Sequence, residues 1–219
     1  CGDAITTGAS NTAMGHEAMS TCTTGTENVA IGRYALQDLT TAANCTAVGY
    51  NAGKDITTGN NNTCIGEIAG GEITTASDCT FIGQTAGDSV TTGSNNTSVG
   101  GASFRTATTG ANNTSMGYSA AGAVTTASNN SAFGAFALDA NTTGAQNTAY
   151  GYGALGANTT ASYNDAFGYG ALDACTTGTP NVAIGSNSLG VLTTGINNVA
   201  VGYNAGDAIT TACCNTIVG

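Results

Sequence analysis

The sequence predicts an all-β protein, a parallel β-solenoid (β-roll) of thirteen 17-residue coils. Three observations predict it: a glycine recurs every 17 residues without insertion or deletion, a Thr-Thr pair recurs with the same step, and most repeats contain Asn before a short alternating segment. Constant repeat length is typical of a solenoid, because each coil must stack in register on its neighbour. At a strand spacing of ~4.8 Å, thirteen coils would form a rod about 60 Å long.

The recurring glycine ends each repeat, and we number the repeat so that it occupies position 17. We expect it to adopt a positive φ or to lie where backbone passes too close for a Cβ atom. These structural turn glycines are Gly15, Gly32, Gly49, Gly66, Gly83, Gly100, Gly117, Gly134, Gly151, Gly168, Gly185, Gly202 and Gly219.

Position 13 is Asn in eleven repeats and Cys in the other two, Cys45 and Cys79. Stacked Asn side chains form ladders, in which each amide donates to the carbonyl of its copy in the next coil and satisfies turn groups that would otherwise be buried unpaired. The predicted ladder comprises Asn11, Asn28, Asn62, Asn96, Asn113, Asn130, Asn147, Asn164, Asn181, Asn198 and Asn215.

Two short strands per coil are predicted. Positions 13 to 17, typically Asn-Thr-Ala-Val-Gly, alternate with period two, and positions 4 to 8 give a weaker strand signal. We expect the apolar residues at positions 16 and 7 to fill the interior, with positions 14 and 4 contributing. The Ala columns at positions 3 and 15 have two interpretations: a flat face where identical rods pack, or burial inside their own coil.

Composition restricts the possible partners. The chain has 33 Gly, no Trp, 7% charged residues and a net charge of −10, and its three basic residues, Arg33, Lys54 and Arg105, are scattered. Without a basic patch, nucleic acid is not an expected partner. No stretch reaches the roughly 20 apolar residues of a membrane span, so membrane insertion is not expected. Because residues 1–219 begin and end in phase with the repeat, we expect one array cut from a longer fibre polypeptide.

Eight cysteines fall at unrelated positions of the repeat. Cys45 and Cys79 share position 13, but they are two coils apart, about 9.6 Å at the strand spacing, which is too far for a disulfide. We expect free thiols that act as small apolar residues, with bridges between chains as the alternative.

The residues that follow Asn carry a family resemblance. Residues 28–32 and 181–185 read Asn-Val-Ala-Ile-Gly, and residues 198–202 read Asn-Val-Ala-Val-Gly. These segments resemble repeats in the head domains of trimeric autotransporter adhesins, and the fuller unit with Thr-Thr-Gly resembles repeats of phage tail fibres and bacterial surface proteins. The resemblance implies a left-handed β-roll, a homotrimer and an extracellular position on a virion or cell surface. No ligand-binding residue belongs to the motif.

Groups suited to catalysis are sparse. The one histidine, His16, lies at a variable turn position, and Asp139, Asp173 and Asp207 share position 5 in every second coil, about 9.6 Å apart. That separation is too large for a paired-carboxylate mechanism or a calcium site. We therefore expect no enzyme activity, no cofactor and no metal.

Five tyrosines follow the repeat glycine directly and form the candidate contact surface. Aromatic rings can pack on sugar faces, so a cell-surface glycan or another receptor is a possible partner; covering a turn or a subunit seam is the alternative. The five are Tyr50, Tyr118, Tyr152, Tyr169 and Tyr203.

Three functions follow from these patterns. A structural and adhesive fibre segment, which builds a rod and presents a host-facing surface, agrees best with the regular length of the repeat. The alternative is an ice-binding β-solenoid that uses stacked Thr columns. It needs the Thr column at position 14 to face outward, because only one Thr of each adjacent pair can do so. A glycan-cleaving spike would need a carboxylate pair that the columns lack.

Overall fold

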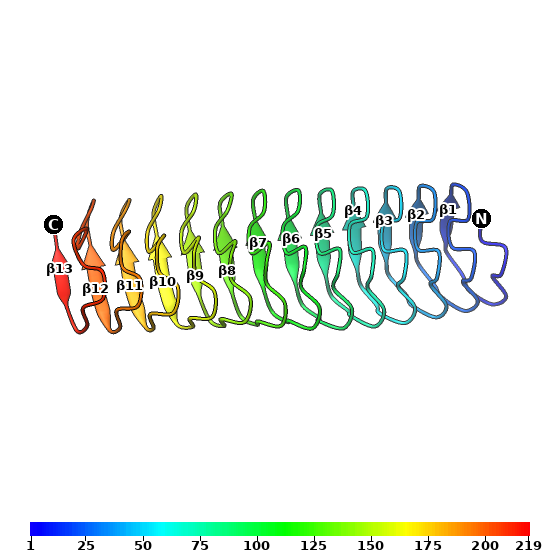
Figure 1. Ribbon diagram of the computed structural model, residues 1–219. Helices are drawn as coiled ribbons and strands as arrows, with labels where there is room; N and C mark the ends of the chain where they lie inside the picture. The colour runs from blue at the N-terminus through cyan, green and yellow to red at the C-terminus, as the bar shows by residue number, and fades with distance from the viewer.

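The computed structural model describes residues 1–219 as one thirteen-stranded parallel sheet whose strands pair in sequence order. Figure 1 shows an elongated stack with the chain ends at opposite ends of the rod. Each strand pairs with the strand 17 residues further on, as in Thr46↔Thr63. This confirms the predicted parallel β-solenoid. The strands are β1 (Thr12–Met14), β2 (Val29–Ile31), β3 (Thr46–Val48), β4 (Thr63–Ile65), β5 (Thr80–Ile82), β6 (Thr97–Val99), β7 (Thr114–Met116), β8 (Ser131–Phe133), β9 (Thr148–Tyr150), β10 (Asn164–Phe167), β11 (Asn181–Ile184), β12 (Asn198–Val201) and β13 (Thr216–Val218).

Each coil contains one strand, so the predicted second strand at positions 4 to 8 is wrong. Position 4 adopts a left-handed backbone, with φ of 48° at Leu36 and 57° at Leu138, whereas a strand requires negative φ. The segment instead stacks as turns: Leu36 N–H donates to Ala52 O at 3.1 Å, and Thr40 N–H donates to Thr57 O at 3.0 Å. Coil stacking therefore pairs the backbone without a second sheet.

The interior lies on the opposite side of the strand from the side that we predicted. Ala47, Cys64 and Phe81, all at position 15, are fully buried, whereas Val48 and Ile65 at position 16 are partly or largely exposed. The prediction that position 16 fills the interior, with help from position 14, is therefore wrong. Positions 7 and 4 do face the interior, as Leu39, Ile56 and Leu36 show.

Both Ala columns lie inside the coil. Position 3 is buried from Ala18 to Ala205, and position 15 is buried from Ala30 to Ala200. Burial within the coil is the interpretation that holds, and these columns form no outer face. On the strand, the mostly small residues at position 15 face the interior and the larger residues at position 16 lie outside, while larger interior residues such as Leu36 and Ile56 come from positions 4 and 7.

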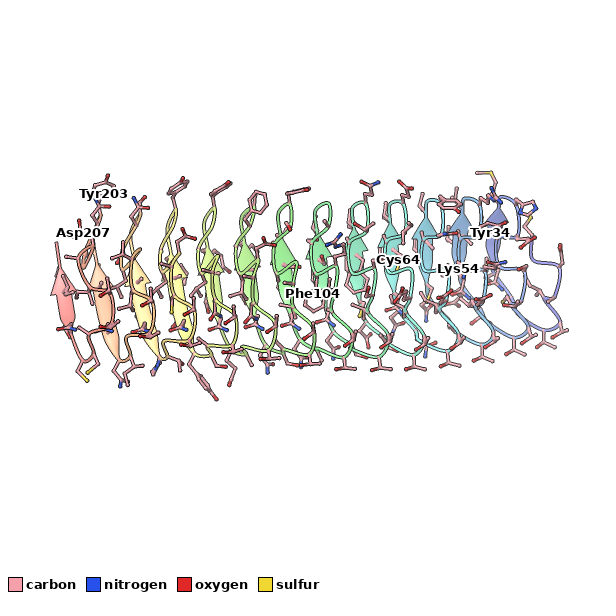
Figure 2. All side chains as sticks on the ribbon, viewed as in Figure 1. Tyr34, Lys54, Cys64, Phe104, Tyr203 and Asp207 are labelled. Atoms are coloured by element: carbon pink, nitrogen blue, oxygen red, sulfur yellow. The ribbon has the colours of Figure 1, made fainter.

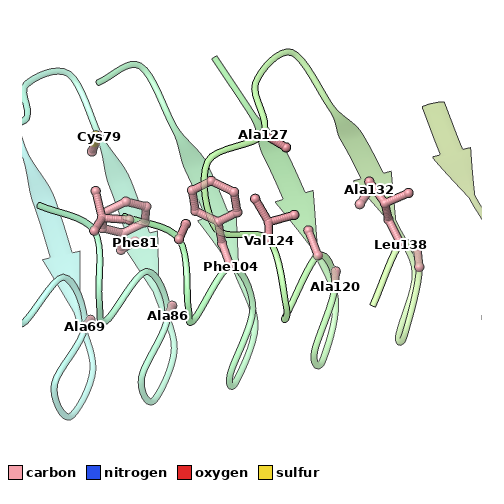
Figure 3. Close-up of a cluster of buried hydrophobic side chains, with 14 of the residues drawn as sticks. Ala69, Cys79, Phe81, Ala86, Phe104, Ala120, Val124, Ala127, Ala132 and Leu138 are labelled. Atoms are coloured by element: carbon pink, nitrogen blue, oxygen red, sulfur yellow. The ribbon is translucent and has the colours of Figure 1, made fainter. Parts of the chain in front are cut away.

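Interior side chains compensate for one another in size. An added Cβ at Gly87 would lie 2.6 Å from the ring of Phe81, so the glycine makes room for a large residue at position 15. One coil further on the sizes reverse, with Ser98 at position 15 and Phe104 at position 4, both buried. Figure 3 shows Phe81 and Phe104 in one apolar cluster along the rod axis.

The repeat glycine is required on two grounds. Its φ lies between 116° at Gly219 and 143° at Gly49, a region that residues with a Cβ rarely adopt. At Gly100, an added Cβ would also lie 2.4 Å from Gly117 O in the next coil. Coils can therefore approach at strand spacing only where no side chain stands between them.

The Asn column forms a buried ladder with a different pattern of partners from the one expected. Asn113 Nδ2 donates to Ala127 O at position 10 of the next coil, 3.0 Å away, and Asn113 Oδ1 accepts the backbone N–H of Asn130 at 2.9 Å. The amide also donates to Asn96 Oδ1 in the preceding coil at 3.1 Å. Asn113 thus connects its coil to both neighbours.

Candidate interaction surface

The outer face of the sheet carries two uninterrupted rows of side chains, from positions 14 and 16. Successive strand residues point to opposite faces, so burial of position 15 sends both of its neighbours outward. Position 14 is mostly Thr. The row at position 16 is apolar throughout: Met14, Ile31, Val48, Ile65, Ile82, Val99, Met116, Phe133, Tyr150, Phe167, Ile184, Val201 and Val218.

Charge is almost absent from this face. Asp165 is the one residue of the charged types Asp, Glu, Lys and Arg at positions 14 and 16, and the others lie at positions 1, 2, 5, 6 and 12. Lys54, at position 5, has its Nζ 2.7 Å from Asp55 Oδ1 and 4.0 Å from Asp38 Oδ2, both at position 6, so these charges pair with one another outside the two rows. The outer sheet face is therefore a continuous, nearly uncharged stripe along the rod.

Three consecutive coils place stacked aromatic rings on this stripe. Phe133 and Tyr150 have ring centroids 4.4 Å apart at an interplanar angle of 15°, and Tyr150 and Phe167 are 5.2 Å apart at 18°. The strand spacing of ~4.8 Å lies within the range of centroid separations at which aromatic rings stack, so aromatic residues at the same position of neighbouring coils come into contact. This outward stack lies where the sequence predicted residues of the interior.

The five candidate tyrosines lie on one corner of the coil, and all are exposed (Figure 2, where Tyr203 is labelled). The structure brings two of them together, since Tyr152 and Tyr169 stack at 5.5 Å and 10°. Phe136, which the column analysis missed because it occupies position 2 rather than 1, packs edge-on against both Tyr118 and Tyr152. Tyr50 and Tyr203 lie apart, in other coils.

Stacking limits what the paired tyrosines can do. Tyr152 and Tyr169 cover one ring face of each other, whereas a sugar packs against an open face. Tyr203, at 71%, is the most exposed of the five, and neither Tyr203 nor Tyr118 has a face-to-face stacking partner. Contact with a glycan remains a prediction, and these two rings are the best placed for it.

The two threonines of each pair differ in environment. The first Thr is partly buried along most of the rod, and its hydroxyl donates to the carbonyl of the first Thr in the next coil, as from Thr57 to Thr74 at 3.0 Å. The second Thr, such as Thr75 or Thr92, is exposed. Thr63, at position 14, belongs to another Thr row on the outer sheet face, so the condition for a second outward Thr row is met.

Titratable groups are dispersed. His16 is exposed and lies 3.7 Å from Glu17. An open hollow of about 370 Å³ lies between coils and is lined by Asp173, Asp207 and neighbouring Asn and Gly residues. Burial raises the pKa of the Asp173 carboxyl. No three metal-ligating side chains lie together.

All eight cysteines are free thiols. Five are buried, and burial raises the pKa of Cys64 well above the usual value and that of Cys79 to about 11. A buried thiol with a raised pKa is a poor nucleophile, so these residues serve as packing groups. Cys1, Cys213 and Cys214 are exposed, which leaves bridges between chains as an open alternative for them.

The chain contains no helix with the length and apolar character that a membrane span requires. No family model, curated protein or solved structure matches the sequence. The features of the molecule that bear on function are the geometry of the coil and the two outer rows.

Proposed function

We propose that this chain is a structural and adhesive fibre segment, of the tail-fibre or surface-adhesin type, that builds a rigid rod and presents a host-facing surface. The observation that carries the proposal is the unbroken register of thirteen strands along one axis. No insertion interrupts the stack to form a cleft, and every coil repeats the same outward positions. Such a molecule spaces and displays surfaces.

Rigidity has a direct structural basis. Neighbouring coils are joined by strand pairing, by the Asn ladder and by hydroxyl bonds along the first Thr of each pair, as from Thr91 to Thr108 at 3.1 Å. In a solenoid, each repeat gains its stability from these contacts with its neighbours. Bending the rod would open bonds of all three kinds on one side at once.

The proposed setting is extracellular, on a virion or a cell surface, with the chain as a homotrimer. Its partners would be copies of itself and a cell-surface glycan or other receptor, without nucleic acid, membrane insertion, cofactor or enzyme activity. Support comes from the resemblance of the repeats and from the exposed aromatic corner around Tyr118 and Tyr203.

Electron microscopy of the purified chain tests the rod. We expect straight particles of uniform length, about 60 Å per array at the strand spacing. Compact or flexibly bent particles would contradict a rigid fibre segment. Binding of the chain to glycan-coated beads, compared with a Tyr118→Ala and Tyr203→Ala double variant, tests the host-facing surface.

A second candidate function is ice binding, and one observation favours it. Thr residues at position 14 face outward in five consecutive strands, β3 to β7, beside an aliphatic row and without charge. A regular, uncharged row of hydroxyl and methyl groups can order water at its own repeat distance. Thermal hysteresis at millimolar protein would support this function, and its absence would remove it.

A further inference from the structure

We propose that the outer face of the sheet, formed by positions 14 and 16 of β1 to β13, is where identical copies of the chain pack against one another. The inference rests on the proposed fibre function and names its assembly surface. It replaces the Ala columns at positions 3 and 15, which are buried inside the coil.

Area is the first argument. A rod about 60 Å long with strands of three residues, about 10 Å, presents a face of about 600 Å² on each copy. Two such faces together bury about 1,200 Å², the lower limit for stable specific interfaces. The row at position 16 supplies the apolar part of this face, and the row at position 14 is mostly Thr. The face is therefore large enough to assemble copies.

Composition is the second argument. Interface cores are depleted of charge and enriched in aromatic residues and Met. The row at position 16 contains Met14 and Met116, the stacked rings around Tyr150, and otherwise Ile and Val. The stacked rings are already ordered in the single chain, so they lose little side-chain entropy when a partner covers them. We expect them to anchor the contact.

Charge distribution identifies the occupant as a second copy. The chain carries a net charge of −10, almost all of it on positions away from the sheet. Copies that meet through positions 1, 2, 5, 6 or 12 bring carboxylates together, whereas each sheet face contributes Asp165 as its one acidic residue. A second copy also offers side-chain rows with the same spacing, so the contact can repeat along the whole rod.

The test compares two double variants that each introduce two carboxylates by substitution in the same two coils. Ile82→Asp with Val99→Asp places two carboxylates on the sheet face, and Thr75→Asp with Thr92→Asp places two at exposed sites on the second-Thr row. Association is measured by sedimentation velocity over a concentration series, and folding is measured by far-UV circular dichroism.

We expect the native chain and the Thr75/Thr92 variant to associate equally. The Ile82/Val99 variant should be folded and monomeric, with a dissociation constant raised by about 100-fold or more. Equal association of both variants would overturn the proposed face. A monomeric native chain would also overturn the proposed assembly face, but straight rods in electron microscopy would still support the fibre function.

Should the Asp variant unfold, Ile82→Thr with Val99→Thr keeps β-branched residues and removes apolar surface. We expect this variant to remain folded and to associate at least about 10-fold more weakly than the native chain. Unchanged association of this variant would overturn the proposal. Thermal hysteresis from a monomeric native chain would overturn both the assembly face and the fibre function.

Discussion

Alanine at Gly100 is expected to cost far more stability than alanine at the adjacent Gly101. Gly100 has φ of +137°, and its added Cβ would lie 2.4 Å from Gly117 O and 2.6 Å from Gly117 C. Both neighbours are backbone and belong to a coil held at strand spacing, so they cannot move apart locally. At Gly101, the nearest atom to an added Cβ is Tyr118 Cδ2 at 3.6 Å, an ordinary contact.

The expected magnitude has two parts. A non-glycine residue in such a sparsely populated backbone region costs about 2 kcal/mol, and forcing neighbouring backbone aside costs about another 2 kcal/mol. Gly100→Ala should therefore lose about 4 kcal/mol, and Gly101→Ala should change stability by less than about 0.5 kcal/mol. Urea unfolding followed by far-UV circular dichroism measures both. Similar losses in the two variants, or a loss below about 1 kcal/mol at Gly100, would refute this account of coil stacking.

Three further changes probe other columns. Asn113→Ala removes the buried hydrogen bonds to Ala127 O and from Asn130 N–H and should lower the free energy of unfolding by about 1–3 kcal/mol. Asn112 is exposed and has φ of 59°, so Asn112→Gly should leave stability nearly unchanged. Equal urea midpoints for the two variants would contradict the ladder. Phe81→Ala should lower the free energy of unfolding by about 3–5 kcal/mol. Gly87→Leu should destabilise the native chain but recover part of the loss when it is combined with Phe81→Ala, because the two positions share interior space. Additive losses in the double variant would contradict this. Desolvation raises the folded-state pKa of Asp173, so the ionised carboxylate destabilises the fold increasingly as pH rises through the carboxyl range. Asp173→Asn should therefore raise the melting temperature at pH 7 but not at pH 2.5. An equal gain at both pH values would contradict this origin.

The repeat length and the recurring Gly and Asn positions could be predicted from the sequence because each of them is required by the local structure of the coil. The glycine at position 17 cannot carry a Cβ, and the Asn at position 13 satisfies buried backbone groups in the eleven repeats that contain it, so both recur with little change. Constant spacing then implies stacking in register, and stacking implies a parallel sheet.

The direction of the side chains could not be predicted in the same way. Alternation along the strand separates position 15 from positions 14 and 16, but it does not say which set faces inward. Large apolar residues at position 16, such as Ile31 and Val48, favoured an inward assignment on size alone. The structure reverses it: Ala30 and Ala47 at position 15 are fully buried, and the large residue at this position, Phe81, is accommodated by Gly87 on the facing segment.

The second predicted strand failed for a backbone reason. Position 4 is Leu or Met in many coils, and these residues give a strand signal when read alone. Gly53, Gly70, Gly87 and Gly206 occupy the same position in other coils, and this substitution pattern is the signal of a left-handed backbone that could have been read from the sequence.

The aromatic corner shows the limit of analysis by single columns. Phe136 lies at position 2 and Tyr152 at position 1 of the following coil, yet their rings are 5.6 Å apart. Neighbouring positions on neighbouring coils become adjacent in space once the coil turns sharply after the repeat glycine. A search across diagonal as well as vertical neighbours would have found this pair.

The mass of the native chain in solution, measured by light scattering, tests the account most directly. The account predicts a concentration-dependent rise above the single-chain mass of 21.2 kDa, because the outer sheet face offers identical copies a large and nearly uncharged contact; the proposed homotrimer would bring the mass to about three times that value. A mass of 21.2 kDa at every concentration would contradict it, and would mean that the outer sheet face functions in direct contact with solvent.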